Sequence, residues 1–259
     1  MKIVASLAAL ALSLTALAAH AQAPATPSPE CDASASVDTR LAAAEARTDR
    51  PDKQKSLDAV RDSEDRFLLQ YVKPGDHVLD LGAGGGYSSM ILSATVCDGS
   101  VDAQNPADWV SSPNAQSAWA ALTAARSNLH AVTSDFTAVP MPAQPYDVIF
   151  IGTIYHDTYN EAGADAVAMD KNLLATLKPG GLVVVIDHNA VAGSGASATN
   201  TLHRIDKAQV LADFQAAGFQ LVGDSDALAN PKDDHTLKVF DPAIRGYTDR
   251  MALVFKKPE

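Results

Sequence analysis

The sequence is poor in cysteine and in basic residues, and both shortages restrict what the protein can be. Among 259 residues there are 2 cysteines, and 20 lysines and arginines stand against 31 aspartates and glutamates, for a net charge of −11. This balance argues against nucleic acid or an anionic membrane as partner, because binding to phosphate backbones needs clustered Lys and Arg. No internal repeat is visible either. The remaining expectation is one domain with a single core.

Long apolar runs are also scarce, and the candidate membrane segment lies at the N-terminus. Its uncharged run from Ile3 to Ala18 is short for a bilayer-spanning helix. Lys2 precedes the run and the small-residue sequence AHA ends at Ala21. This order predicts a cleavable secretory signal over residues 1–21 and a periplasmic or secreted protein, with an uncleaved anchor as the alternative. The Pro/Ser/Ala-rich stretch that follows predicts a flexible linker over residues 22–36.

Cys31 and Cys97 make up the whole cysteine content. Export would permit a disulfide bridge between the N-terminal segment and the core. Two separate thiols are an equally open interpretation.

The rest of the chain alternates between strand and helix patterns. Residues 37–75 predict an N-terminal segment of one or two helices interrupted at Pro51, and residues 76–259 predict the main domain. The predicted strands are HVLDLG, SVDAQN, LHAVTSD, YDVIFIG, GLVVVIDH, FQLVGDSD and MALVFKK. Helix-like segments between them are GYSSMILSATV, SPNAQSAWAALTAARS, AGADAVAMDKNLLATL and DKAQVLADFQAAG.

Strand and helix in alternation predict an α/β fold, with a Rossmann-like sheet that is mostly parallel and has helices on both faces. The last two strands depart from the alternation, because no helix of ordinary length separates FQLVGDSD from MALVFKK. We therefore expect seven strands with an antiparallel last strand.

The glycine cluster in VLDLGAGGGYSS follows the first predicted strand and precedes a helix. Gly82, Gly84 and Gly86 would let the backbone turn tightly and approach a ligand closely at a helix N-terminus. The pattern favours a nucleotide-like ligand. A turn without a ligand and a dinucleotide site are the alternatives.

This stretch resembles the first motif of class I S-adenosylmethionine-dependent methyltransferases. Members of that group typically carry an acidic residue before the glycines, here Asp80, and a turn before the fifth strand, here LKPGG. They also end with an antiparallel seventh strand inserted beside the sixth. A closer resemblance is to exported bacterial predicted methyltransferases, through the segments QNP, YHD, DHNAVAGSG, TLHRID and FDPAIRGYTDR.

The resemblance implies S-adenosyl-L-methionine as cofactor and assigns residues to it. The implied cofactor-binding residues are Asp80, Gly82, Ala83, Gly84, Gly86, Asn105, Asp135 and Phe136. Asp80 would support the turn or bind the donor's amino group, and Asp135 would face the adenine amino group. Asn105 is a departure, since the second strand of this fold usually ends in Asp or Glu. An amide oxygen can accept a hydrogen bond from one ribose hydroxyl, but this bond lacks the added strength that a charged carboxylate acceptor gives.

Methyl transfer needs an aligned nucleophile and, where that nucleophile carries a proton, a base. His156 follows the fourth strand, where this fold presents substrate-facing residues, and is the predicted base; the alternative is that it only lines the pocket. Tyr155 or Asp157 could orient it. His188 and His203, after the fifth strand, are further catalytic candidates.

Three other sets of residues have more than one interpretation. Arg204 and Arg245 could bind an anionic substrate or pair with Asp206 and Asp249. No metal site is expected, although Asp157, Asp187, His188 and Asn189 gather near two neighbouring strand ends as oxygen ligands do in catechol-type methyltransferases. Trp109, Trp119 and Phe214 are expected to pack in the core or between helices. The connection over residues 227–250 is a candidate lid.

Together these observations predict a methyltransferase that acts on a small-molecule acceptor in the cell envelope. Neither nucleic acid nor a membrane beyond the export signal is an expected partner. The alternative is a non-catalytic protein that binds a nucleoside or another metabolite on the same scaffold, since a fold does not fix a function. The sequence indicates neither the acceptor nor the oligomeric state.

Overall fold

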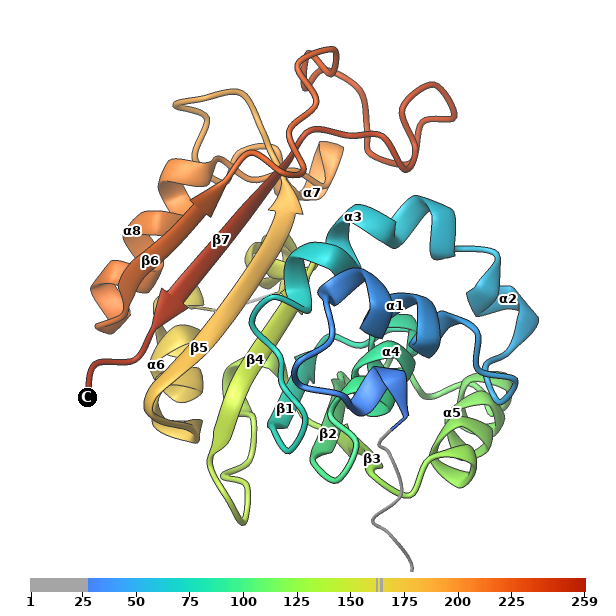
Figure 1. Ribbon diagram of the computed structural model, residues 1–259. Coiled ribbons are helices and arrows are strands. Elements are labelled where there is room, and N and C mark those ends of the chain that lie inside the picture. The colour runs from blue at the N-terminus through green and yellow to red at the C-terminus, as the bar shows by residue number, and fades with distance from the viewer. Residues whose placement is uncertain (1–27, 162, 164) are drawn as a thin grey trace, which may run out of the picture.

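The computed structural model describes residues 28–161, 163 and 165–259 and shows one seven-stranded sheet between two layers of helices (Figure 1). The predicted signal over 1–21 lies outside the described residues. The strands are β1 (His77–Leu81), β2 (Ser100–Asn105), β3 (Leu129–Thr133), β4 (Tyr146–Gly152), β5 (Leu177–His188), β6 (Gln220–Ser225) and β7 (Arg250–Lys256). The α-helices are α1 (Val37–Glu45), α2 (Asp52–Lys55), α3 (Asp58–Leu68), α4 (Tyr87–Thr95), α5 (Pro113–Ala125), α6 (Ala166–Thr176), α7 (Thr199–Leu202) and α8 (Lys207–Ala217).

The strand order β3-β2-β1-β4-β5-β7-β6 confirms the predicted fold class. Strand β7 is antiparallel to both β5 and β6, with Val184 opposite Val254. Because β6 and β7 are joined by a connection without a helix, β7 returns in the opposite direction and fits between β5 and β6. All other neighbouring strands are parallel.

The buried strands carry apolar side chains on both faces. On β4, Val148 and Phe150 face the layer that contains α1, α3, α4 and α5, whereas Ile149 and Ile151 face the layer of α6 and α8. Successive side chains of a strand point to opposite faces, so a continuous apolar run is what a sheet covered on both sides requires. Because β1, β2, β4 and β5 are parallel, their carboxyl ends meet at one edge of the sheet, and this edge carries the candidate site.

Helix ends agree with local sequence signals. The Ser112 hydroxyl accepts from the backbone N–H of Ala115 and caps α5, whose first residue is Pro113. Asp206 caps α8 in the same way, and Gly218 ends it with a φ of 103°. A polar acceptor at the start and glycine in the left-handed region at the end are the expected stops for these helices.

The N-terminal region differs from its prediction in two ways. Three helices replace the one or two expected. The chain is interrupted before Pro51, which caps α2, and it is interrupted again between Lys55 and Asp58 before α3. The described part of the predicted 22–36 linker is not a free linker: the 3-10 turn η1 (Pro29–Cys31) packs on α1 and α4. Cys31 is also bridged to Cys97, which decides between the two interpretations of the cysteines.

Candidate active site

The glycine turn after β1 is held by side chains from β2 and α5. Gln104 Oε1 accepts a hydrogen bond from the backbone N–H of Gly82 (3.1 Å), and Asn105 Oδ1 accepts from that of Gly84 (2.7 Å). The indole Nε1 of Trp119 donates to the carbonyl oxygen of Gly84 (3.1 Å). Asn105 therefore uses its amide oxygen to fix the turn, which is a different task from the ribose contact that the resemblance implies.

The three glycines are required for different reasons. A Cβ atom on Gly82 would lie 2.8 Å from Ile154 Cγ1, and one on Gly86 would lie 2.6 Å from Leu122 Cδ1. Protein packing thus requires both. A Cβ atom on Gly84 would meet its nearest atom, the Gly82 carbonyl oxygen, only at 4.0 Å, and Gly84 has a φ of +55°. Gly84 is the glycine that leaves room for a ligand.

A cavity of about 580 Å³ lies over the glycine turn, within the range of small-ligand sites. Its lining includes Asp80, Gly82, Ala83 and Gly84 from the sequence prediction, together with Gln54, Leu57, Arg61, Trp109, Thr153 and Ile154. The segment from α2 to α3 forms one wall, and Gln54 Nε2 in that segment donates to the carbonyl oxygen of Gly85 (3.1 Å). The N-terminal helices therefore close one side of the site.

Groups of opposite charge line this cavity. Burial raises the pKa of Asp80 to about 6, although the Ser89 hydroxyl donates to its carboxylate at 2.5 Å. The guanidinium of Arg61, paired with Glu64 at 2.7 Å, supplies the positive charge. A ligand part that carries both an ammonium and a carboxylate group would find a counter-charge for each.

The other predicted cofactor residues lie beside this cavity and not in it. Asp135 and Phe136 line a neighbouring cavity of about 280 Å³, and Asn105 lines one of about 480 Å³. Trp109 lines the main cavity, and its ring packs edge-on against that of Phe136 with 5.5 Å between centroids. Trp109 thus stands where the glycine turn and the Phe136 cavity adjoin, a role that differs from the expected core packing.

Thr153, just after β4, lies in the wall of the main cavity with a φ of 58°. A β-branched residue in the left-handed region is a genuine outlier, costing on the order of 1–3 kcal/mol, and such strain persists where surrounding contacts impose it. The backbone N–H of Thr153 donates to the Ile186 carbonyl oxygen (2.6 Å), which ties this strained residue to β5.

His156, the predicted base, lies in the 3-10 turn η3 (Tyr155–Asn160) and is oriented by Asp187 at the end of β5. The Asp187 carboxylate lies 2.8 Å from His156 Nδ1 and accepts from the His156 backbone N–H, also at 2.8 Å. Burial alone would lower the pKa of His156, but the carboxylates of Asp187 and Asp157 together outweigh it and leave the pKa raised. His156 is absent from the lining of the cavity at the glycine turn.

The other end of the His156 ring faces two predicted catalytic residues. His156 Nε2 lies 3.3 Å from His203 Nδ1 and 3.4 Å from Asp157 Oδ1. One of the predictions needs correction. Tyr155 does not orient His156, because its buried hydroxyl donates to Asp170 Oδ2 of α6 at 2.9 Å. The catalytic role of His188 stays a prediction: its Nδ1 lies 2.8 Å from Thr248 Oγ1, and burial lowers its pKa to about 4.

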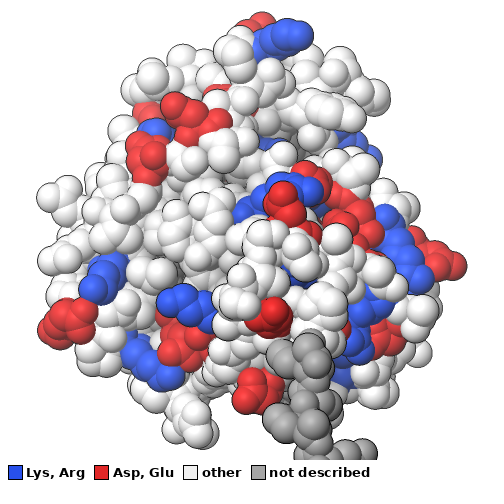
Figure 2. Space-filling view, viewed as in Figure 1, with Lys and Arg blue, Asp and Glu red and all other residues white. Residues whose placement is uncertain are grey.

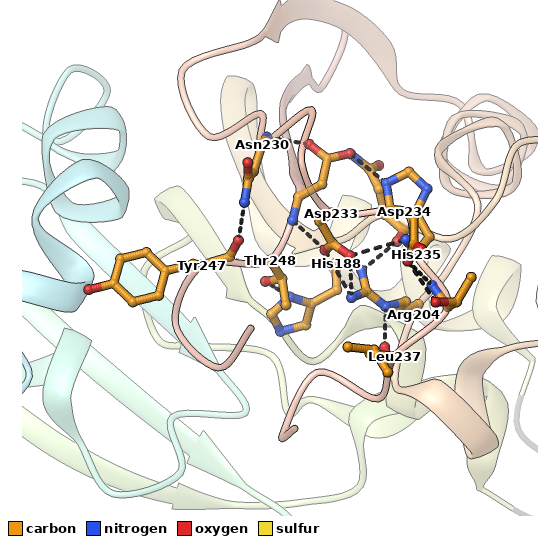
Figure 3. A network of polar contacts seen from close by, with 12 residues as sticks. His188, Arg204, Asn230, Asp233, Asp234, His235, Leu237, Tyr247 and Thr248 are labelled. Carbon is orange, nitrogen blue, oxygen red and sulfur yellow. Dashed lines mark hydrogen bonds and ion pairs between the residues drawn. The ribbon is translucent and has the colours of Figure 1, made fainter. Parts of the chain in front are cut away.

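The connection between β6 and β7 is fastened at its base by a buried ion pair (Figure 3). Arg204 Nη2 lies 3.0 and 2.9 Å from the two Asp233 oxygens, and Arg204 Nε donates to the Leu237 carbonyl oxygen (3.0 Å). Arg204 is therefore structural, but its partner is Asp233 and not the predicted Asp206. Asp249 accepts from Asn189 Nδ2 (2.9 Å) and not from Arg245. These contacts fix the part of the candidate lid that lies nearest the sheet.

Comparison with known proteins now identifies the group to which this geometry belongs. Residues 65–210, more than half of the chain, match the family described as Protein-L-isoaspartate(D-aspartate) O-methyltransferase (PCMT). The chain belongs to the PCMT family. PCMT membership and the glycine-turn site make it a class I S-adenosylmethionine-dependent methyltransferase, with S-adenosyl-L-methionine as cofactor. No curated protein matches the chain in sequence.

Solved structures similar to this PCMT-family chain share its fold. The methyltransferase in complex with the Haloferax volcanii Trm112 activator has a TM-score of 0.58 at 18% identity, covering 83% of this chain and 98% of that one. A SAM-dependent methyltransferase from Aquifex aeolicus gives 0.55 at 20%, covering 80% and 98%. The [4+2]-cyclase SpnF gives 0.57 at 16%, covering 77% and 81%. Because a cyclase also has this fold, these likenesses establish the architecture alone.

Proposed function

We propose that this PCMT-family protein transfers the methyl group of S-adenosylmethionine to a small-molecule acceptor in the cell envelope. The observation that carries the proposal is the cavity over the glycine turn, with Arg61, Asp80 and the open space beside Gly84 in one place. Arg61 and Asp80 would hold the carboxylate and ammonium groups of the cofactor, and Trp109 would wall its nucleoside part. When bound, the cofactor supplies a methyl carbon activated by a positively charged sulfur.

The enclosure of the cavity supports a small acceptor. The α2 to α3 segment covers one side through the Gln54 contact with Gly85, so the site is better suited to a molecule that enters a pocket than to a folded protein surface. Thr153 and Ile154 follow β4 and line the same cavity, which makes them the residues we expect to contact the acceptor. Alignment and exclusion of water are the contributions that this wall would make.

The charge distribution supports the absence of nucleic acid from the proposed partners. The face seen in Figure 2 carries basic and acidic side chains interspersed, without a broad basic patch. The net charge of −11 points the same way, because phosphate binding needs clustered positive charge.

An envelope location is supported by the Cys31–Cys97 bridge, since disulfides persist mainly in oxidising compartments. The N-terminal sequence up to Ala21 agrees with it. Intact mass measurement of the protein from its native host tests the location: a species that begins at Gln22 is expected, and one that retains Met1 would contradict it.

A binding protein without turnover is the second candidate, and the position of Asn105 favours it. Its amide oxygen is already bonded to the Gly84 N–H, so the ribose hydroxyls would face a weaker set of acceptors than in an enzyme with an acid here. The same cavity would then hold a nucleoside or a related metabolite.

Calorimetry with S-adenosylmethionine and with its demethylated product is the first test. We expect both to bind; if neither does, the proposed function is wrong. The second step follows transfer of a labelled methyl group to panels of small phenols, amines, thiols and carboxylates, with an isoaspartyl peptide alongside. Transfer to a small molecule supports the proposal, transfer to the peptide alone overturns the proposed acceptor class, and binding without any transfer favours the second candidate.

A further inference from the structure

A cluster of three metal-ligating side chains lies outside the lining of the glycine-turn cavity. His156 and Asp157 come from η3 after β4, and His203 ends α7 after β5. His156 Nε2, His203 Nδ1 and Asp157 Oδ1 are mutually 3.3, 3.4 and 3.7 Å apart. Three donor atoms from two segments distant in sequence thus converge on one point.

These separations fit the coordination sphere of one metal ion. Zn²⁺ binds imidazole nitrogen and carboxylate oxygen at about 2.0–2.2 Å with tetrahedral geometry, which places neighbouring ligand atoms about 3.3–3.5 Å apart. The two shorter edges of the cluster match this spacing, and the third needs a contraction of a few tenths of an ångström. Two histidines and one carboxylate are also the donor types that zinc prefers.

The surroundings of His156 hold its ring in the orientation that a metal ligand needs. The Asp187 carboxylate lies 2.8 Å from His156 Nδ1 and accepts a hydrogen bond from the His156 backbone N–H, also at 2.8 Å. Asp187 is fully buried. With the Nδ1 proton directed to Asp187, the lone pair of Nε2 points toward His203 and Asp157. A carboxylate behind a ligating histidine is the common arrangement in zinc sites. Asn160 Nδ2 donates to Asp157 Oδ1 (3.1 Å) and orients that ligand as well.

His203 adds an observation independent of the distances. It lies in the left-handed region with φ 55° and ψ 49°, a conformation that costs a non-glycine residue about 1–2 kcal/mol. Its ring also packs against that of Phe240, with 4.9 Å between centroids. Such strain at a side chain that joins a cluster of ligands is typical of a functional site.

The geometry points to a site for one zinc ion held by His156, Asp157 and His203, with a fourth position open to water or to a small ligand. The open position follows from the exposure of the two outer ligands, whose side chains are 23% and 24% exposed while that of His156 is 3% exposed. Structural zinc sites are closed by four protein ligands, whereas three ligands and an open position characterise sites that bind an exogenous group. This cluster differs from the set of Asp157, Asp187, His188 and Asn189 considered from the sequence. Two members of that earlier set have other partners in the structure: Asp187 orients His156, and Asn189 donates to Asp249.

The alternative is a metal-free hydrogen bond between the two imidazoles, and zinc titration of the full chain distinguishes the two. Protein freed of metal with a chelator is titrated with ZnCl₂ by calorimetry. We expect one ion per chain with a Kd of about 1 µM or tighter, equivalent to about −8 kcal/mol or stronger. Absence of binding at about a hundredfold higher zinc concentration overturns the site, as does a stoichiometry other than one.

Variants separate the cluster from adventitious binding. His203→Asn is the main variant, because asparagine tolerates the left-handed backbone and should keep the fold while weakening binding at least about 100-fold. Asp187→Asn should weaken it about 10- to 100-fold by removing the carboxylate behind His156. His130→Ala, at an exposed histidine on β3, is the matched control and should bind as wild type does. Equal affinity of His203→Asn and wild type would refute the assignment, and circular dichroism of each variant verifies the fold.

The cobalt-substituted protein gives a readout that does not depend on affinity. Co²⁺ in a four-coordinate site of this donor set should show intense visible absorption that disappears in His203→Asn. A spectrum of six-coordinate cobalt, or one unchanged in the variant, would contradict the site. No step of the proposed methyl transfer enters these measurements, so the metal site and the proposed function can fail separately.

Discussion

At the scale of single residues, Gly84 is the glycine beside which a ligand would occupy the space that a side chain would fill. Gly84→Val is expected to abolish binding of S-adenosylmethionine while the fold survives, because the side chain would enter the cavity beside a turn held by Asn105 and Trp119. The left-handed backbone adds a strain of about 1–2 kcal/mol. Calorimetry measures the affinity and circular dichroism the fold. Unchanged affinity would mean that the turn is not the site.

Gly86→Val is the matched control for that experiment. Its Cβ would lie 2.6 Å from Leu122 Cδ1 and 3.1 Å from Trp119 Cη2, in packed protein and not in open space. Overpacking of this kind typically costs about 1–3 kcal/mol, so the main effect should be a lower melting temperature. A variant that loses affinity with its melting temperature intact would place Gly86 in the ligand site as well.

Asn105→Asp tests the departure at the end of β2. The carboxylate can keep the bond from the Gly84 N–H through one oxygen and offer the other to the ribose hydroxyls. We expect S-adenosylmethionine to bind more tightly by up to about 1–2 kcal/mol, measured by calorimetry. Weaker binding would show that the amide is specifically required, and would favour a ligand other than this cofactor.

The residues that the sequence could predict are those tied to a local pattern. Asp80 and the glycines follow a recognisable strand and turn, and Asp80, Gly82 and Gly84 line one cavity. Asp187, Thr153 and Arg61 were not assigned these roles, because their contacts come from strands and helices that adjoin only after folding. Asp187 meets His156 across 31 residues of sequence. The positive φ of Thr153 is a feature that a residue pattern does not predict.

At the scale of elements, the strands and the helical character of the N-terminal segment were predictable, and the number of its helices was not. Each of the seven predicted runs forms a strand. A continuous apolar run such as that of β4 or β5 has few other ways to be buried between helices, whereas β6 lies at the edge of the sheet and is largely exposed. The segment before β1 is polar and only partly amphipathic, so its three helices depend on tertiary contacts. Leu41 and Phe67 from this segment are buried in the same core cluster as Val78 of β1. The division of the chain at residue 75 therefore marks no separate core.

The contact between α3 and α4 should make stability depend on pH. Burial raises the pKa of Asp65 from 3.8 to about 7, although the Tyr87 hydroxyl donates to it at 2.7 Å. Because the folded state then holds the proton more tightly than the unfolded chain, this contribution is complete below pH 4 and is lost as the pH rises to 7. The loss is on the order of 4 kcal/mol at about 1.4 kcal/mol per pKa unit.

Asp65→Asn isolates the contribution of Asp65 to the pH dependence of stability, because asparagine can still accept a hydrogen bond from the Tyr87 hydroxyl and does not titrate. Denaturant unfolding of both proteins at pH 4, 6 and 8 gives the free energy of unfolding of each. We expect the variant to gain on wild type as the pH rises, since all other groups titrate in both proteins. A difference that stays constant over this range would show that Asp65 is not protonated in the folded state.

At the scale of the whole molecule, the site and the covalent tie occupy opposite ends of the sheet. The ligand-side residues lie after the carboxyl ends of β1, β2 and β4, whereas Cys97 lies in the turn that leads into the start of β2. Arg204 and Asp233 fasten the long connection on the ligand side, and the disulfide fastens the N-terminal turn on the other. Stability and ligand binding should therefore respond separately to changes at the two ends.

Removal of the Cys31–Cys97 bridge tests this separation. A bridge across 66 residues of sequence restricts the unfolded chain and contributes about 4 kcal/mol in the chain-entropy account. Cys31→Ser, Cys97→Ser and the double variant should each lower the melting temperature by roughly 10 °C, at about 2–4 °C per kcal/mol for a domain of this size. Wild type treated with a reductant should melt at the same lower temperature, since all four samples lack the same cross-link. Calorimetry at 25 °C should meanwhile show S-adenosylmethionine binding as in wild type, because the glycine turn is fixed by Gln104, Asn105 and Trp119. If the variants melt at the same temperature as the oxidised wild type, the bridge does not stabilise the protein. If the variants also lose affinity for S-adenosylmethionine, the N-terminal turn is coupled to the site.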